Sequence, residues 1–196
     1  MREIKINPRR IKKTDIKLIV DFLRKGKIIV YPTDTVYGLG CLATNKKAIG
    51  RIYRLKRRTK KKPLLVLIAG FKMLKRFFLV DKKQESFLRK IWPAKISVIL
   101  NKKSALPEAL TNGLSSAAVR LPKSKFLTKI IAAVGAPIVS TSLNLSGRKP
   151  LASANNLNNY FKKIKPDLIV NAGPLTGRPS RLIDLRDVCQ PIILRK

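Results

Sequence analysis

The chain of 196 residues is 45% hydrophobic, which is enough to bury the core of one domain and excludes a wholly disordered protein. Its 44 lysine and arginine residues against 10 acidic residues give a net charge of +34, which favours anionic partners such as nucleic acid, nucleotides or an acidic membrane surface. Histidine is absent, which excludes a histidine base, nucleophile or metal ligand, and no apolar run reaches the roughly 18–20 residues that span a bilayer.

The first half of the chain is predicted from apolar spacing and from residues that cap or break helices. In chain order it forms a helix from Thr14 or Asp15 to Gly26, a strand at residues 27–32, a loop at 33–45, a helix at 48–55, a basic loop at 56–63 and a strand at 64–70.

In the second half, Asp81 and Ser124 are expected to cap helices, because a short polar side chain at that position accepts a hydrogen bond from the first turn. The predicted order is a helix from Asp81 toward Pro93, strands at 95–102 and 117–122, a helix from Ser124 to Gly135, a strand at 137–142, a helix from Ser153 to Ile164, and strands at 167–173, 181–186 and 191–196. This alternation predicts an α/β domain, and the late run of strands favours a mixed sheet over a fully parallel one.

The composition also predicts where the protein is located in the cell and whether it builds a metal site. The N-terminal residues lack the apolar stretch of a secretory signal, and the two cysteines, Cys41 and Cys189, are too few for a disulfide framework or a zinc cluster. We therefore expect a cytoplasmic protein. The acidic residues form no close pair in a glycine-rich turn, so we expect no metal site built by the protein, with any Mg²⁺ held mainly by the phosphates of a ligand.

Four polar clusters lie at strand ends or in loops, where the sites of α/β proteins usually form. The chain has neither a G-x-x-x-x-G-K-[ST] loop nor a G-x-G-x-x-G turn, so a nucleotide would bind by other means. The clusters are Tyr31–Gly40 (YPTDTVYGLG), Lys56–Pro63 (KRRTKKKP), Val119–Pro122 (VRLP) and Val139–Gly147 (VSTSLNLSG).

Each cluster admits a functional and a structural interpretation. The first offers hydroxyls, one carboxylate and two glycines that permit close backbone approach, but an ordinary turn has the same composition. The second supplies cations for phosphate or carboxylate, or it is a solvated basic surface. Arg120, in the third, pairs with an anionic ligand or reaches water from an edge strand. In the fourth, Ser140, Ser142 and Asn144 share one face of a strand and suit a nucleotide or a polarised carbonyl, or they form a plain strand end.

Together the four clusters are stronger evidence for a functional site than each one alone, because two are cationic and two are rich in hydroxyl groups. Without histidine or a metal cage, the chemistry would be electrostatic and positional: substrates are aligned and charge is stabilised. The residues thus predict one concave site for ATP or another phosphorylated ligand, together with a carboxylate co-substrate.

In order and spacing, these strings resemble the YrdC-like family of threonylcarbamoyl-adenylate synthases. The matching strings are YPTDTVYGLG, the K-x-R of Lys56 and Arg58, KPLLVLIAG, Trp92-Pro93, VRLP and VSTSLNLSG. The resemblance covers about residues 15–195 and implies a single YrdC-like domain over residues 1–196. It further implies a twisted mixed sheet flanked by helices, with a basic concave face.

The resemblance also implies an activity. ATP, L-threonine and bicarbonate would give L-threonylcarbamoyl-AMP and pyrophosphate, with Mg²⁺ held mainly by the substrate phosphates. A downstream threonylcarbamoyl transferase complex would then modify the adenosine next to the anticodon of certain tRNAs. Direct binding of tRNA or double-stranded RNA is a further expectation, and no membrane partner is expected.

The family's site residues are carried over by position. The expected catalytic residues are Lys56, Arg58, Ser142 and Asn144. The expected ATP site contains these four together with Ser140 and Arg195. The expected threonine site is Thr33, Thr35, Tyr37, Arg120 and Ser180, with Arg120 holding the carboxylate.

Several positions depart from the family pattern, among them three single residues. Arg57 stands where the family usually has glycine or asparagine, Leu143 replaces an alanine, and Arg181 stands where many relatives have threonine. None of these changes removes a core charge, but Leu143 and Arg181 bear on local packing and substrate fit.

Two alternatives remain at this stage. The net charge of +34 also suits a double-stranded RNA-binding or ribosome-assembly protein without catalysis. A carbamoyl-transfer module like the related domain of hydrogenase maturation proteins is disfavoured, because the accessory domains of those proteins are missing.

Overall fold

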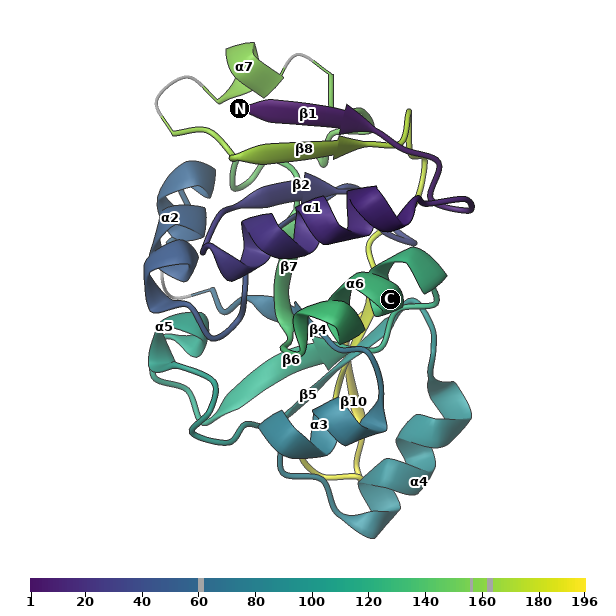
Figure 1. Ribbon diagram of the computed structural model, residues 1–196. Coiled ribbons are helices and arrows are strands. Elements are labelled where there is room, and N and C mark those ends of the chain that lie inside the picture. The colour runs from purple at the N-terminus through teal and green to yellow at the C-terminus, as the bar shows by residue number, and fades with distance from the viewer. Residues whose placement is uncertain (60–61, 156, 162–163) are drawn as a thin grey trace.

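The computed structural model describes residues 1–59, 62–155, 157–161 and 164–196, which are built around one ten-stranded mixed sheet (Figure 1). Across the sheet the strands follow the order β1-β8-β2-β3-β7-β4-β6-β5-β9-β10. Their bounds are β1 (Arg2–Lys5), β2 (Ile29–Tyr31), β3 (Gly38–Gly40), β4 (Leu65–Leu67), β5 (Ile96–Asn101), β6 (Ser116–Arg120), β7 (Ile138–Ser142), β8 (Leu168–Asn171), β9 (Arg181–Asp184) and β10 (Ile192–Arg195). Four neighbouring pairs are parallel and five are antiparallel, which confirms the predicted mixed sheet.

Helices cover both faces of the sheet. Their bounds are α1 (Lys13–Arg24), α2 (Lys46–Lys56), α3 (Phe71–Phe77), α4 (Lys82–Ile91), α5 (Glu108–Thr111), α6 (Lys125–Val134) and α7 (Leu157–Tyr160). Helices α1 and α6 lie side by side over one face (Figure 1), where Ile19 of α1 packs with Ile29 and Tyr31 of β2. Val30 belongs to the other core, which also contains Ile49 of α2. Because successive strand residues point to opposite faces, β2 is buried on both sides.

Several predicted helix ends are confirmed by local hydrogen bonds. Asp81 and Gln84 form a reciprocal capping box at the start of α4. Ser124 accepts a hydrogen bond from the Leu127 N–H at 3.3 Å at the start of α6. Gly135 follows α6 with φ 79°, a left-handed conformation that favours glycine. The start of α1 was predicted at Thr14 or Asp15, but the helix begins at Lys13, after a residue without a side-chain cap.

Four elements were not predicted from the sequence: β1, α3, β3 and α5. The predicted loop at 33–45 contains β3, which has the sequence Gly-Leu-Gly and lacks any strand signal of its own. It forms because it pairs with both β2 and β7. A Cβ atom at Gly40 would lie 2.1 Å from the Val139 carbonyl oxygen, so only glycine allows this approach.

The predicted helix from Ser153 to Ile164 corresponds in part to α7. Ser153 does not cap it, since its hydroxyl accepts a hydrogen bond from the Asn155 N–H instead. Residues 156, 162 and 163 of that prediction lie outside the described residues.

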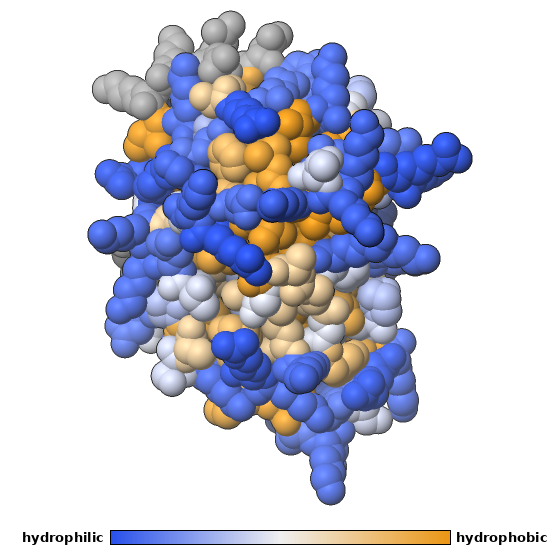
Figure 2. All heavy atoms as spheres, in the orientation of Figure 1, coloured by the Kyte–Doolittle hydropathy of each residue, from blue (hydrophilic) through white to orange (hydrophobic). Residues whose placement is uncertain are grey.

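The surface seen in Figure 2 is mainly hydrophilic, with hydrophobic residues showing between the projecting side chains over the face of α1 and α6. The basic concave face implied by the resemblance remains a prediction. Of the helices in the described ranges, none is long and apolar enough to cross a membrane.

Candidate functional site

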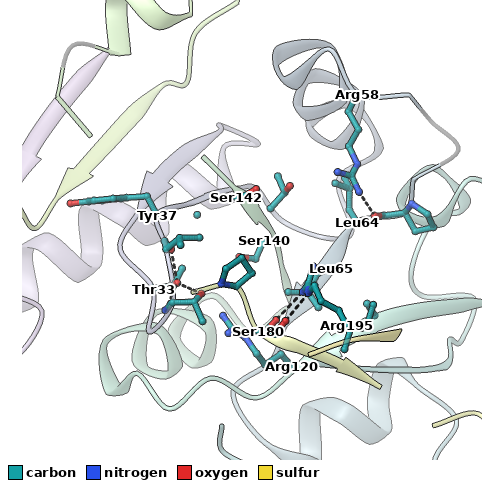
Figure 3. A pocket seen from close by; sticks show the side chains of 18 residues that line it. Thr33, Tyr37, Arg58, Leu64, Leu65, Arg120, Ser140, Ser142, Ser180 and Arg195 are labelled. Carbon is teal, nitrogen blue, oxygen red and sulfur yellow. Dashed lines mark hydrogen bonds between the residues drawn. The ribbon is translucent and has the colours of Figure 1, made fainter. Parts of the chain in front are cut away.

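A cavity of about 280 Å³ lies where segments distant in the sequence converge (Figure 3). It is lined by residues of the β2–β3 loop, the segment between α2 and β4, strands β6 and β7, the segment entering β9, and β10. They are Thr33, Thr35, Val36, Tyr37, Gly38, Arg58, Pro63, Leu64, Leu65, Ala118, Arg120, Ser140, Thr141, Ser142, Pro179, Ser180, Leu182 and Arg195. Nine of the eleven predicted site residues are among them, and the other two, Lys56 and Asn144, lie behind Ser142.

The β2–β3 loop presents two threonine hydroxyls to the cavity. The Thr33 hydroxyl donates to the Val36 carbonyl oxygen at 2.6 Å and accepts from the Thr35 N–H at 3.0 Å. The two hydroxyl oxygens lie 2.8 Å apart. Because the single hydrogen of Thr33 is already used, Thr35 is the donor in this pair. The Thr35 oxygen therefore keeps its lone pairs for a donor group of a ligand.

Tyr37 contributes to the cavity wall, but its hydroxyl points away from the cavity (Figure 3). The hydroxyl donates to the Gly173 carbonyl oxygen at 2.7 Å and accepts from the Ala172 N–H at 2.8 Å. Burial of the side chain raises the pKa of Tyr37. The phenol thus anchors the β2–β3 loop to the segment that follows β8.

Lys56 and Asn144 form a buried clasp behind Ser142. The Lys56 ammonium donates to the Ser142 carbonyl oxygen, to the Asn144 carbonyl oxygen at 2.9 Å and to Asn144 Oδ1 at 2.7 Å. Ser142 Oγ also donates to Asn144 Oδ1, at 2.7 Å. All three ammonium hydrogens are used, which favours the charged form of Lys56. Burial, assisted by nearby Arg58, nevertheless lowers the pKa of Lys56 to about 7.

Arg58 is a second cation of the site: it lines the cavity, is half-buried, and is held by backbone carbonyl groups. Its Nε donates to the Lys62 carbonyl oxygen at 2.9 Å and its Nη2 to the Pro63 carbonyl oxygen at 3.0 Å. Burial lowers the pKa of Arg58. Lys60 and Lys61 of the predicted basic loop lie outside the described residues.

Arg120 projects from the end of β6 into the cavity wall and is only 2% exposed. Its Nη2 lies 3.1 Å from Asp34 Oδ1, while Nε and Nη1 have no hydrogen-bond partner. Burial lowers the pKa of Arg120, and the Asp34 carboxylate opposes that shift. The sequence pointed to Arg120 but assigned no role to Asp34, because their proximity depends on tertiary structure.

The far wall joins β9 and β10. Arg195 Nε donates to the Ser180 carbonyl oxygen at 2.8 Å, and Ser180 Oγ lies 2.8 Å from Ser97 Oγ. Ser97 was not predicted as a site residue, because it lies within an apolar strand, β5, with no polar neighbour to mark it. A Cβ atom at Gly177 would lie 1.7 Å from the Thr35 carbonyl oxygen, so the segment leading to Ser180 packs directly on the threonine loop.

The departures from the family pattern fall in different environments. Leu143 is fully buried in the core, and its N–H donates to the Tyr37 carbonyl oxygen at 2.9 Å. Arg181 is exposed at the start of β9. Arg57 ends α2 in the left-handed conformation, with φ 50°.

Among its described residues, the cavity presents no carboxylate ligand for a metal ion. No acidic residue is found among those that line the cavity. Over the described residues, no group of three or more cysteine, aspartate and glutamate side chains is placed to hold a metal ion. The arrangement therefore suits an anionic ligand bound by arginine, hydroxyl and amide groups.

Comparison with known proteins relates the chain to one family. A family model of Sua5, YciO and YrdC proteins, described as Telomere recombination, matches residues 21–196. The chain is 34% identical over 189 residues to a threonylcarbamoyl-AMP synthase of Pyrococcus abyssi, covering 95% of this chain and 55% of the relative. It is 33% identical over 186 residues to a threonylcarbamoyl-AMP synthase of Blochmanniella floridana, covering 92% of this chain and 95% of the relative.

The fold is also shared with a solved structure. The crystal structure of P. abyssi Sua5 complexed with L-threonine matches with a TM-score of 0.87 and 31% identity, covering 99% of this chain and 56% of that chain. The chain spans about half the length of the Pyrococcus relative and nearly all of the Blochmanniella one. The region matched by the family model includes every residue that lines the cavity.

Proposed function

This chain belongs to the Sua5, YciO and YrdC family, and from that premise we propose that its cavity forms L-threonylcarbamoyl-AMP from L-threonine, bicarbonate and ATP, with release of pyrophosphate. Residues 1–196 would act as one YrdC-like domain, and the product would serve the modification of tRNA next to the anticodon. The relatives that support the activity are themselves named threonylcarbamoyl-AMP synthases.

The observation that carries the proposal is the state of Arg120. A guanidinium that is 2% exposed lines a cavity with two of its nitrogen atoms unpartnered. Buried polar groups normally have partners, so a ligand carboxylate that accepts from Arg120 would complete its hydrogen bonding. The free lone pairs of Thr35 lie in the same cavity and would accept from the hydroxyl or amino group of an amino acid.

Arg58 and Arg195 line the same cavity and would hold the phosphates of ATP. Arginine suits this role because its planar donors match phosphate oxygens. The Lys56 ammonium would act through the clasp, holding the Ser142 and Asn144 groups in one arrangement next to the reacting atoms. Ser140 also lines the cavity and would offer a further hydroxyl to the nucleotide or carbamate.

The reaction needs two bond exchanges. The amino nitrogen of threonine bonds to the carbon of bicarbonate as water leaves, which gives a carbamate. A carbamate oxygen then bonds to the α-phosphorus of ATP while the bond from that phosphorus to the pyrophosphate oxygen breaks. No histidine is available, so the residues here act by alignment and by stabilising negative charge.

Mg²⁺ would enter bound to ATP as part of the substrate. Because the described residues that line the cavity include no carboxylate, the ion would be held mainly by the ATP phosphates. We further propose that the product passes to a threonylcarbamoyl transferase complex in the cytoplasm, and that tRNA binding draws on the net charge of +34.

The test is mass spectrometry of the purified protein incubated with ATP, Mg²⁺, L-threonine and isotope-labelled bicarbonate. We expect labelled threonylcarbamoyl-AMP and threonine-dependent pyrophosphate, both absent when threonine is omitted. Arg120→Ala should abolish product, whereas Arg54→Ala, on the exposed face of α2, should leave it unchanged. Absence of product from folded protein that binds ATP would overturn the proposal.

The second candidate is a double-stranded RNA-binding protein without catalysis, which the net charge favours. Salt dependence does not separate the two functions, because both involve polyanions. The variant Arg120→Ala separates the two functions. It removes a buried side chain from the cavity wall, so synthase activity would disappear while RNA affinity would change little.

A further inference from the structure

Three buried side-chain polar atoms lack a hydrogen-bond partner in the described part of the chain, and all three belong to one ion pair. They are Asp34 Oδ1, Arg120 Nε and Arg120 Nη1. Native proteins satisfy nearly all such groups, so an exception needs an explanation. We propose that Asp34 is a positioning residue, which holds Arg120 by one corner of its guanidinium so that the remaining donors stay available for a substrate carboxylate.

Asp34 is fixed on both sides. Its Oδ2 accepts from the Lys123 N–H at 3.1 Å, and its Oδ1 lies 3.1 Å from Arg120 Nη2. The carboxylate is 10% exposed and is not among the residues that line the cavity. It therefore lies behind the wall and joins the β2–β3 loop to the end of β6 without touching a ligand.

The position of Asp34 in the chain explains how one residue affects two substrate contacts. Its neighbours Thr33 and Thr35 line the cavity, whereas the Asp34 side chain turns to Arg120 and Lys123. The same short loop thus presents hydroxyls to the ligand and holds the arginine beside them. Figure 3 shows the Arg120 guanidinium directed toward the Thr33 loop.

Charge is essential to this arrangement. A guanidinium removed from water needs a counter-charge, and a neutral partner in place of Asp34 would leave Arg120 as an uncompensated buried cation. Arg195, which lines the same cavity, adds a second positive charge near Arg120, which increases that penalty. Without the carboxylate, the guanidinium would leave its place at the wall to reach water, and its free donors would no longer converge on a ligand.

The inference rests on the proposed function in one respect: the ligand at Arg120 carries a carboxylate. The probes are therefore L-threonine and L-threoninol, which has a hydroxymethyl group in place of the carboxylate. Their dissociation constants are compared by calorimetry for the wild type and for Asp34→Asn, which keeps an oxygen for the Lys123 N–H but removes the charge.

We expect the wild type to prefer threonine, and Asp34→Asn to reduce that preference about tenfold, the size of one charge-assisted hydrogen bond. The affinity for ATP should remain unchanged. As the matched control, Asp184→Asn removes the carboxylate of the surface pair with Arg186 and should leave all affinities as in the wild type.

Other outcomes overturn the inference. An unchanged or increased preference in folded Asp34→Asn would show that Asp34 does not position Arg120. Parallel weakening of threonine, threoninol and ATP would reduce Asp34 to a structural role. Should Asp34→Asn not fold, Asp34→Glu carries the same test, because a carboxylate displaced by one methylene should still lower the preference. A wild type that shows no preference would instead overturn the carboxylate site of the proposed function, together with this inference.

Discussion

Residue 57 has a backbone conformation that suits glycine better than arginine. Arg57 ends α2 with φ 50° and ψ 40°, and its N–H donates to the Arg54 carbonyl oxygen at 3.1 Å. An L-residue in this region costs about 1–2 kcal/mol, whereas glycine loses about 0.5–1 kcal/mol more backbone entropy on folding. Arg57→Gly should therefore raise the free energy of unfolding by about 0.5–1 kcal/mol.

Urea denaturation followed by Trp92 fluorescence measures this change, since Trp92 is the single tryptophan and is buried. For a chain of this size the gain corresponds to a rise in Tm of about 1–4 °C. The matched control is Arg54→Gly, at an exposed position within α2, which should lose about 1 kcal/mol through helix propensity. If Arg57→Gly destabilised the protein as Arg54→Gly does, the left-handed conformation of residue 57 would be refuted.

Three further predictions concern residues in or next to the cavity wall. Burial lowers the pKa of Lys56 in the folded protein from 10.5 to about 7. Between these pH values the unfolded chain binds one more proton than the folded protein, so the free energy of unfolding, measured by urea titration, should rise with pH. Lys56→Met should remove this rise. Gly177→Ala places a Cβ atom 1.7 Å from the Thr35 carbonyl oxygen and must displace the threonine loop, so calorimetry should show threonine binding weakened about tenfold. Leu143→Ala creates a cavity in the core and should cost about 2–5 kcal/mol of stability in urea denaturation.

Each of these has a control on the same chain. Lys47→Met, at an exposed position of α2, should keep the rise of stability with pH, and a rise that persists in Lys56→Met would contradict the lowered pKa. Gly50→Ala should leave threonine binding intact, because a Cβ atom there has no neighbour within 4 Å. Leu114→Ala, at a residue that is 53% exposed, should change stability by less than about 0.5 kcal/mol; an equal loss at both leucines would contradict the core position of Leu143.

Helix ends were predictable where a capping side chain forms a local hydrogen bond, or where a glycine adopts the left-handed conformation that ends a helix. Asp81 with Gln84, Ser124 and Gly135 act within one turn of chain, so their patterns are visible without the rest of the fold. The polar residues of the β2–β3 loop, Arg58, Arg120 and the serines of β7 were likewise expected to meet, because polar residues at strand ends converge at one site in α/β folds. Thr33, Thr35, Tyr37, Arg58, Arg120, Ser140 and Ser142 do line one cavity.

Strand pairing and sheet order depend on contacts between distant segments of the chain, so only the tertiary structure decided them. Strand β3 exists only because β2 and β7 lie on either side of it, and the Gly-Leu-Gly sequence carries no strand preference. The sheet order, with β5 between β6 and β9, has no local signal. The polar strand β1 was missed because it forms by pairing with the distant β8. Helix α3 has Phe71, Leu74 and Phe77 at helical spacing, a local signal from which it could have been predicted.

In the cavity, too, some features follow from residue types and others from packing. Residue types alone predicted an anion site built from arginine, hydroxyl and amide groups, and they excluded any role for histidine. The orientation of each side chain was decided by packing. The Tyr37 hydroxyl turns toward Gly173, and the Lys56 ammonium lies behind Ser142. Asp34 reaches Arg120 across 86 positions of the chain because folding brings together groups that sequence spacing cannot relate.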